Sequence, residues 1–208
     1  QLFGGLAKEF NVTLVAGSIV LPAPYVKQGV LHAGSGPLFN SSVVFAGDGS
    51  LLGQPQHQQF PDSEMRRYVH DGRQHPLQVL QTPAGRLGVL VGSDSWYPEN
   101  HQQLARQAVQ LIANPVFLSG KGSWQAPWRG NRHQDASAGL ALQRGEVSEQ
   151  AAWQRLTEAA GAGVSSMSVF MRGQFWEQGS DGQGFARQAG ELLAGTPSPG
   201  ARLLNLWL

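Results

Sequence analysis

The sequence contains no cysteine among its 208 residues. This absence excludes disulfide bridges, thiolate metal sites and catalysis by a thiol. Charge is also scarce, because Asp, Glu, Lys and Arg make up 14% of the chain and the formal net charge is +1. Neither nucleic acid nor an anionic membrane is therefore indicated as a partner.

Long hydrophobic runs are missing as well. A stretch such as LGVLVG at 87–92 is far shorter than the roughly 18 apolar residues that a membrane-spanning helix needs. No basic segment followed by an apolar one resembles a leader peptide. We therefore expect no membrane association and a cytoplasmic location. The chain starts at Gln1 inside a helical pattern, so we expect that an upstream segment has been removed or precedes it.

The first half of the chain alternates apolar segments with turn residues. An Asp-Gly turn at 47–49 between two expected strands is a typical hairpin signal. The other assignments follow from hydrophobic periodicity and from Pro and Gly content. The expected elements are a helix (2–10), a strand (12–21), a Pro- and Gly-rich loop (22–37), a hairpin (38–54), a polar surface loop (60–76) and a second hairpin (77–92).

The second half continues the alternation of helices and strands. Pro98 begins a helix whose expected buried stripe consists of Leu104, Ala105, Ala108 and Val109. Ser148 is expected to cap a helix that stops at Gly161. The remaining elements are a strand (110–117), a long loop with one helical turn (118–145), a strand (164–171), a hairpin (182–195) and a last strand (201–208). This pattern predicts one α/β domain over 1–208 with a mixed sheet or a pair of sheets.

A strand, a turn and a helix follow one another in GVLVGSDSWYPEN, residues 88–100. Such a junction is where many α/β hydrolases present their nucleophile, because a sharp turn at the end of a strand exposes one side chain. The residue at the turn is Gly92, which has no side chain that could attack a substrate.

Several segments together resemble the nitrilase, or carbon–nitrogen hydrolase, superfamily. The opening LAKEFNVTLVAGSI is similar to the family's helix and strand, and GSDSWYPE is similar to its nucleophile motif C-Y-D-x-x-[FY]-P-E. The resemblance extends over nearly the whole chain. The other segments that carry it are GPLFNSSVVFAGDG (36–49), AVQLIANP (108–115) and GFARQAGELLA (184–194).

This resemblance implies an αββα sandwich, cleavage of amides or nitriles by a Glu-Lys-Cys triad, and assembly into dimers. It also implies that a strand and helix with the triad glutamate lie upstream of Gln1. The family's register places the cysteine at Gly92 and the lysine at Gln56, so both catalytic side chains are replaced. Glu64 corresponds to an additional loop glutamate found in many members.

The remaining candidates for a pocket are His57, Ser93, Asp94, Trp96 and Trp124. Ser93 is more simply a small polar filler than a nucleophile, since GSDSW does not complete a G-x-S-x-G elbow. Trp96 is interpreted first as a core residue, whereas for Trp124 and Trp128 a ligand contact and core packing are equally weighted. The other histidines, including His133, lack zinc-ligand spacing, so we expect no metal and no cofactor.

Three functional hypotheses follow from these residues. The first is a nitrilase-fold protein that has lost amidase chemistry and acts as a binding or regulatory domain for a small-molecule ligand, as a homodimer. The second is a hydrolase with a re-purposed site that uses His57, Glu64 or Ser93. The third is a structural subunit that pairs with an active homologue or with the upstream segment.

Overall fold

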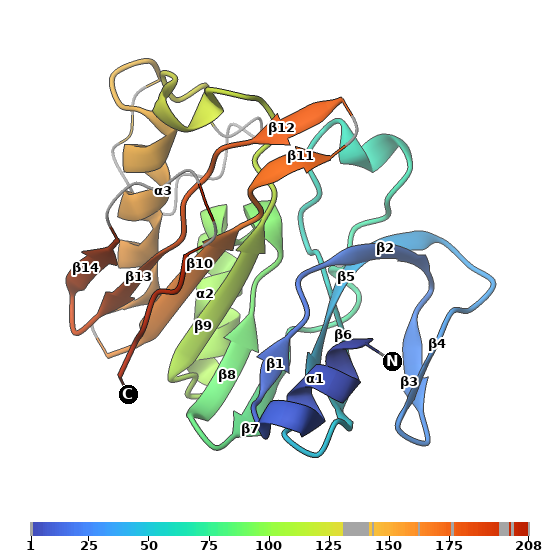
Figure 1. Ribbon diagram of the computed structural model, residues 1–208. Coiled ribbons are helices and arrows are strands. Elements are labelled where there is room, and N and C mark those ends of the chain that lie inside the picture. Colours follow the sequence, from blue (N-terminus) through green and yellow to red (C-terminus); the bar gives the residue numbers. More distant parts are fainter. Residues whose placement is uncertain are drawn as a thin grey trace.

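The computed structural model describes residues 2–130, 142, 144–161, 163–175, 177–195, 200 and 202–207. Two β-sheets face each other, and helices cover their outer sides (Figure 1). This is the αββα arrangement that the resemblance implies. His133 lies outside the described residues.

The larger sheet has six strands and mixes parallel with antiparallel pairs. Strands β8, β9 and β10 run parallel to one another at its centre, and the outer pairs are antiparallel. The expected mixed sheet is therefore confirmed. Its order is β14 (Glu191–Ala194), β13 (Phe185–Gln188), β10 (Ser165–Phe170), β9 (Leu111–Val116), β8 (Gly85–Val89) and β7 (Val79–Thr82).

The smaller sheet is built around β5 (Leu38–Phe45), which pairs antiparallel with β6 (Leu51–His57) through the expected turn at 47–49. On its other side β5 pairs first with β2 (Ile19–Pro22) and then with β1 (Leu14–Val15). The single strand expected at 12–21 is therefore two strands. Gly17, at φ +72°, lies between them in a conformation that interrupts a ladder.

Two short hairpins lie outside the two sheets. The segment 22–37 was expected to be a loop, but it contains β3 (Tyr25–Lys27) and β4 (Val30–His32). Gln28 and Gly29 join them with φ of +51° and +74°, the positive angles of a tight two-residue hairpin turn. The second hairpin, β11 (Gly173–Phe175) and β12 (Gln178–Ser180), was also missed.

Three α-helices form the outer layers. Helix α1 (Leu2–Phe10) packs against β5 of the smaller sheet. Helices α2 (Pro98–Arg106) and α3 (Glu149–Leu156) cover the larger sheet, and η4 (Thr157–Ala160) prolongs α3. Ser148 caps α3 as expected, because its hydroxyl accepts a hydrogen bond from the Ala151 N–H.

The core follows the two faces of the larger sheet. Val89 and Val91 meet Val44 and Leu52 of the smaller sheet, whereas Leu90 faces Leu104 of α2 on the opposite side. Strand β8 and its extension are therefore buried on both faces, as the continuous apolar run predicts.

The stripe expected on α2 is only half correct. Leu104 and Val109 are buried, but Ala105 and Ala108 are exposed. The helix ends at Arg106, so Ala108 lies beyond it at φ +55°.

The end of the chain also differs from expectation. Residues 202–207 form no strand, and Leu203 and Trp207 are 86% and 84% exposed. Within the residues described, no helix combines the length and hydropathy needed to cross a bilayer.

Candidate functional site

The strand–turn–helix junction forms as expected. Leu90 and Val91 extend β8 into η2 (Gly92–Trp96), and α2 then starts at Pro98. Gly92 has φ +56°, in the left-handed region that glycine adopts at little cost. The turn therefore favours glycine at residue 92, and an L-amino acid with a side chain would be strained there.

Asp94 is a structural carboxylate beneath this turn. Its side chain is 0% exposed and accepts hydrogen bonds from the backbone N–H groups of Gln59 (2.9 Å), Phe60 (2.8 Å) and Val91 (3.4 Å). Burial raises the pKa of Asp94 to about 7, and the three N–H groups act in the opposite direction by favouring the ionised form. Asp94 thus joins the loop after β6 to the turn after β8.

Gln58 reaches the position where a side chain at residue 92 would begin. A Cβ atom built on Gly92 would lie 3.2 Å from Gln58 Nε2. The Gln58 amide also donates to Ser93 Oγ (3.1 Å) and accepts from Asn40 Nδ2 (2.9 Å). Ser93 Oγ in turn donates to the Phe60 carbonyl (2.8 Å). Neither hydrogen-bond partner of Ser93 is a side-chain base.

Gln56, where the family's register places the lysine, is directed elsewhere. Its Oε1 accepts from the Gln78 N–H (2.9 Å), and its Nε2 donates to the Gln54 carbonyl (3.3 Å). The amide therefore bridges β6 and the segment before β7. The side chain that the structure brings to the turn is that of Gln58.

His57 belongs to a separate cluster. Its Nδ1 lies 2.8 Å from Ser41 Oγ, its ring stacks on Phe39 at 4.6 Å, and the edge of the His75 ring lies 4.7 Å away between centroids. Burial, with a smaller contribution from His75, lowers the pKa of His57 to about 4. His57 is therefore neutral at pH 7.

Glu64 is exposed and flanks η1 (Met65–Arg67) in the loop after β6. Its backbone N–H bonds to Asp62 Oδ1 at 2.9 Å.

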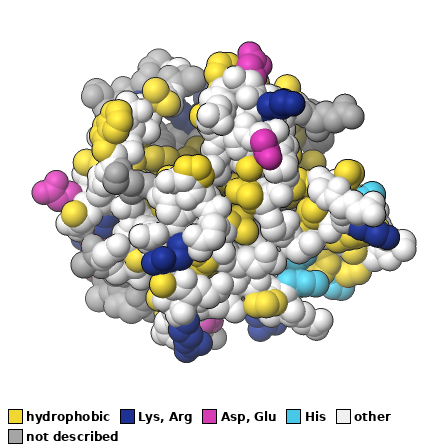
Figure 2. Space-filling view, turned by 90° about the horizontal axis from the view of Figure 1, so that it is seen from below, with side chains coloured by type: hydrophobic (Ala, Val, Ile, Leu, Met, Phe, Trp, Pro, Cys, Tyr) yellow, Lys and Arg dark blue, Asp and Glu magenta, His cyan; other side chains and the backbone are white. Residues whose placement is uncertain are grey.

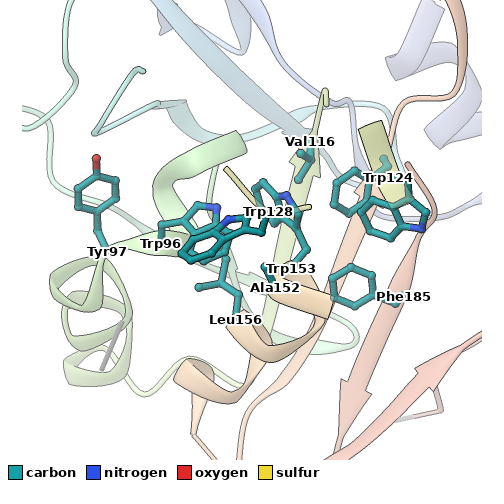
Figure 3. Close-up of a cluster of buried hydrophobic side chains, with 10 residues drawn as sticks. Trp96, Tyr97, Val116, Trp124, Trp128, Ala152, Trp153, Leu156 and Phe185 are labelled. Carbon is teal, nitrogen blue, oxygen red and sulfur yellow. The ribbon is translucent and has the colours of Figure 1, made fainter. Parts of the chain in front are cut away.

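Trp96, Trp124, Trp128 and Trp153 belong to a core cluster on the α3 side of the larger sheet, which Figure 3 shows in close-up. Trp96 stacks on Trp128 at 5.4 Å and meets Trp153 edge-on at 5.2 Å. Trp124 packs against Phe170 at 4.8 Å. Trp96 and Trp124 are only 4% and 1% exposed, so their burial favours core packing over a ligand contact.

Buried polar residues that the sequence did not single out hold the turn from below. Asn114 Nδ2 donates to the carbonyl of Leu90 (2.6 Å) and Ser95 Oγ donates to Asn114 Oδ1 (3.1 Å). Asn100 of α2 donates to the Asp94 carbonyl (2.9 Å). The signal for Asn114 is a polar residue inside an apolar strand, which requires hydrogen-bond partners when it is buried.

A cavity of about 760 Å³ lies away from this site, between β10, the β11–β12 hairpin and the residues Gly200, Arg202, Leu203 and Leu204. Its wall includes Met167, Val169 and Arg172 but none of the residues around Gly92. Among the described residues, no three His, Asp or Glu side chains are grouped so that they could hold a metal ion. The face seen from below carries separate basic and acidic side chains, with no broad area of one sign (Figure 2).

Comparisons with known proteins place this geometry in a family. The sequence profile of the carbon–nitrogen hydrolases matches residues 1–173. The chain is 24% identical over 118 residues to an N-carbamoylputrescine amidase of Solanum lycopersicum, covering 56% of this chain and 35% of that protein. It is 22% identical over 142 residues to a citrullinase of Francisella tularensis, covering 63% of this chain and 46% of that protein. The chain thus spans about a third to a half of the length of these relatives.

Solved structures show the same fold. A carbon–nitrogen hydrolase from Helicobacter pylori G27 superposes with a TM-score of 0.64 at 21% identity, over 91% of this chain and 59% of that one. An amidase variant from Nesterenkonia sp. AN1 in complex with butyramide superposes with a TM-score of 0.63 at 20% identity, over 95% and 62%. With the family profile matching most of its length, this chain belongs to the carbon–nitrogen hydrolase family.

Proposed function

We propose that this chain is a carbon–nitrogen hydrolase-family domain that does not cleave amides by the covalent route and serves as a binding or regulatory domain. The observation that carries the proposal is the glycine at the turn. Residue 92 offers no nucleophile, and the amide of Gln58 closes the space where its side chain would begin. The chain holds no cysteine elsewhere that could replace it.

A lysine is missing as well as the nucleophile. The sequence has no lysine between Lys27 and Lys121, and both Gln56 and Gln58 are neutral. An oxyanion that formed near Gly92 would therefore meet an amide in place of an ammonium group. In other hydrolases, loss of a nucleophile that works as one unit with its partners costs on the order of a millionfold in rate.

The test is an ammonia-release assay of the purified chain with amides, nitriles and N-carbamoyl compounds. Butyramide, citrulline and N-carbamoylputrescine belong in the panel because the names of similar proteins contain them. We expect no turnover above the buffer rate. Turnover that Ser93→Ala or Gln56→Ala abolishes would overturn the proposal and support a re-purposed active site.

A second proposal is a structural role, in which the chain pairs with a second copy or with an active homologue. Helix α1 carries this proposal, because Leu2, Phe3 and Phe10 are 70%, 43% and 65% exposed on an outer layer. Contiguous exposed apolar side chains are characteristic of interaction surfaces. Sedimentation velocity should then show a species heavier than the monomer. The double variant Leu2→Ser/Phe10→Ser should dissociate this species. A wild-type chain that stays monomeric at high concentration would contradict self-pairing.

A further inference from the structure

The side chain of Gln58 is held in place by a directional chain of hydrogen bonds. Asn40 donates to Gln58 Oε1, Gln58 Nε2 donates to Ser93 Oγ, and Ser93 donates to the Phe60 carbonyl. Because the hydroxyl hydrogen of Ser93 is directed at a carbonyl, its oxygen must accept from Gln58. This fixes the NH2 end of the Gln58 amide toward residues 92 and 93.

The amide is buried and fills the space over the turn. Gln58 is 3% exposed. Apart from the adjoining residues and the backbone of η2, its Nε2 is the only described atom within 4 Å of the Cβ position of Gly92. The contact distance of 3.2 Å is shorter than ordinary van der Waals contact, so any side chain at residue 92 would press against this amide.

The group that occupies this space is itself a carboxamide. It presents one carbonyl oxygen and one NH2 group, as acetamide does, and it meets an amide donor on one side and a hydroxyl acceptor on the other. The immediate partners, Asn40 and Ser93, are uncharged. Such a set of neutral donors and acceptors is suited to a neutral amide and gives no compensation to a charged ligand.

We propose that the space beside Gly92 is a binding site for a small carboxamide and that the Gln58 side chain occupies it as an internal ligand. The inference deepens the proposed function and rests on it, since both concern the same turn. It explains why the site is closed in this chain. Removal of the Gln58 side chain should open the site to a free amide of similar size.

The absence of native cysteine provides a direct test. Gly92→Cys, and Ser93→Cys as a second reporter in case the first fails to fold, each give a protein with a single thiol. Alkylation by iodoacetamide is followed by intact mass. Addition of Gln58→Ala should raise the alkylation rate by about tenfold or more, because the thiol is no longer covered. Gln56→Ala is the matched control and should leave the rate unchanged, since Gln56 bonds to backbone groups away from the turn.

Ligand-detected NMR with acetamide completes the test. Binding should be seen with Gln58→Ala and not with the wild type or with Gln56→Ala. Alkylation rates that agree within about twofold with and without Gln58 in the folded reporters would overturn the internal-ligand proposal. Absence of acetamide binding to folded Gln58→Ala would overturn the ligand class. Neither readout depends on turnover, so hydrolysis by the wild type would refute the proposed function separately.

Discussion

Oδ1 of Asp94 accepts a 2.8 Å hydrogen bond from the backbone N–H of Phe60, across 34 residues of sequence. The contact ties the loop that leaves the smaller sheet to the turn that leaves the larger one. Because the Asp94 carboxylate is fully buried, water competes little for this contact. The relative position of Gln58 and Gly92, on which the proposed site depends, is therefore set by a carboxylate that is itself not exposed.

Replacement of Asp94 by Asn should destabilise the fold. An Asn side chain has one acceptor oxygen, so its NH2 group would face a backbone N–H that now lacks a partner. Leaving a buried donor unsatisfied costs about 1–3 kcal/mol. Urea unfolding at pH 7 measures the loss. Glu9→Gln on exposed α1 is the control and should stay within about 0.5 kcal/mol of wild type; an equally stable Asp94→Asn would contradict the structural role.

The turn could be predicted from sequence, and its surroundings could not. Glycine after an apolar strand and proline at a helix start are local signals, and both hold at Gly92 and Pro98. That Gln58 and not Gln56 reaches the turn depends on how the chain leaves β6 and on a contact between segments 35 residues apart. Periodicity within one segment contains no information about such a contact. For the same reason the polar inner face of α2 was missed, because Asn100 is buried against the carbonyl of Asp94.

Substitution of Gly92 should reveal the Gln58 contact. Gly17 is a matched control, since its φ of +72° is also left-handed but, apart from its two chain neighbours, no described atom lies within 4 Å of its Cβ position. Gly17→Ala should therefore cost only the conformational strain, about 1–2 kcal/mol. Gly92→Ala should cost more, and Gln58→Ala should reduce the excess in a double-mutant cycle. Equal losses of unfolding free energy in Gly17→Ala and Gly92→Ala would show that the Gln58 side chain moves aside without an energetic penalty.

His57 should make a pH-dependent contribution to stability. Its pKa falls from 6.5 to about 4 on folding, so the folded state favours the neutral ring. The contribution is complete above pH 6.5 and is lost as the pH falls toward 4, because the unfolded chain takes up the proton first. The slope in this window is at most about 1.4 kcal/mol per pH unit. The stability advantage of wild type over His57→Gln should therefore shrink over this range.

Wild type must be compared with His57→Gln because Asp94 changes the stability with pH in the direction opposite to His57. Its pKa is raised to about 7, so the folded state binds a proton more tightly and gains stability as the pH falls from 7 toward 3.8. The two contributions oppose each other between about pH 4 and 6.5. Unfolding free energies of wild type, His57→Gln and the control His32→Gln, measured across this range, separate them. A wild-type advantage over His57→Gln that stays constant with pH would contradict the burial-induced shift.

Trp124 tests how a Gly- and Trp-rich segment should be interpreted. Such a segment has no hydrophobic periodicity, so the sequence could not distinguish a ligand-binding loop from a loop that packs on the core. The 1% exposure of Trp124 and its contact with Phe170 assign it to the core. Trp124→Ala should cost about 3–5 kcal/mol, because a large cavity remains. Trp207, 84% exposed, is the control, and Trp207→Ala should change the unfolding free energy by less than about 0.5 kcal/mol. A small loss of unfolding free energy in Trp124→Ala, combined with weakened ligand binding, would instead indicate that Trp124 lines a binding site. A side chain in contact with solvent and ligand contributes little to the folding of the free protein.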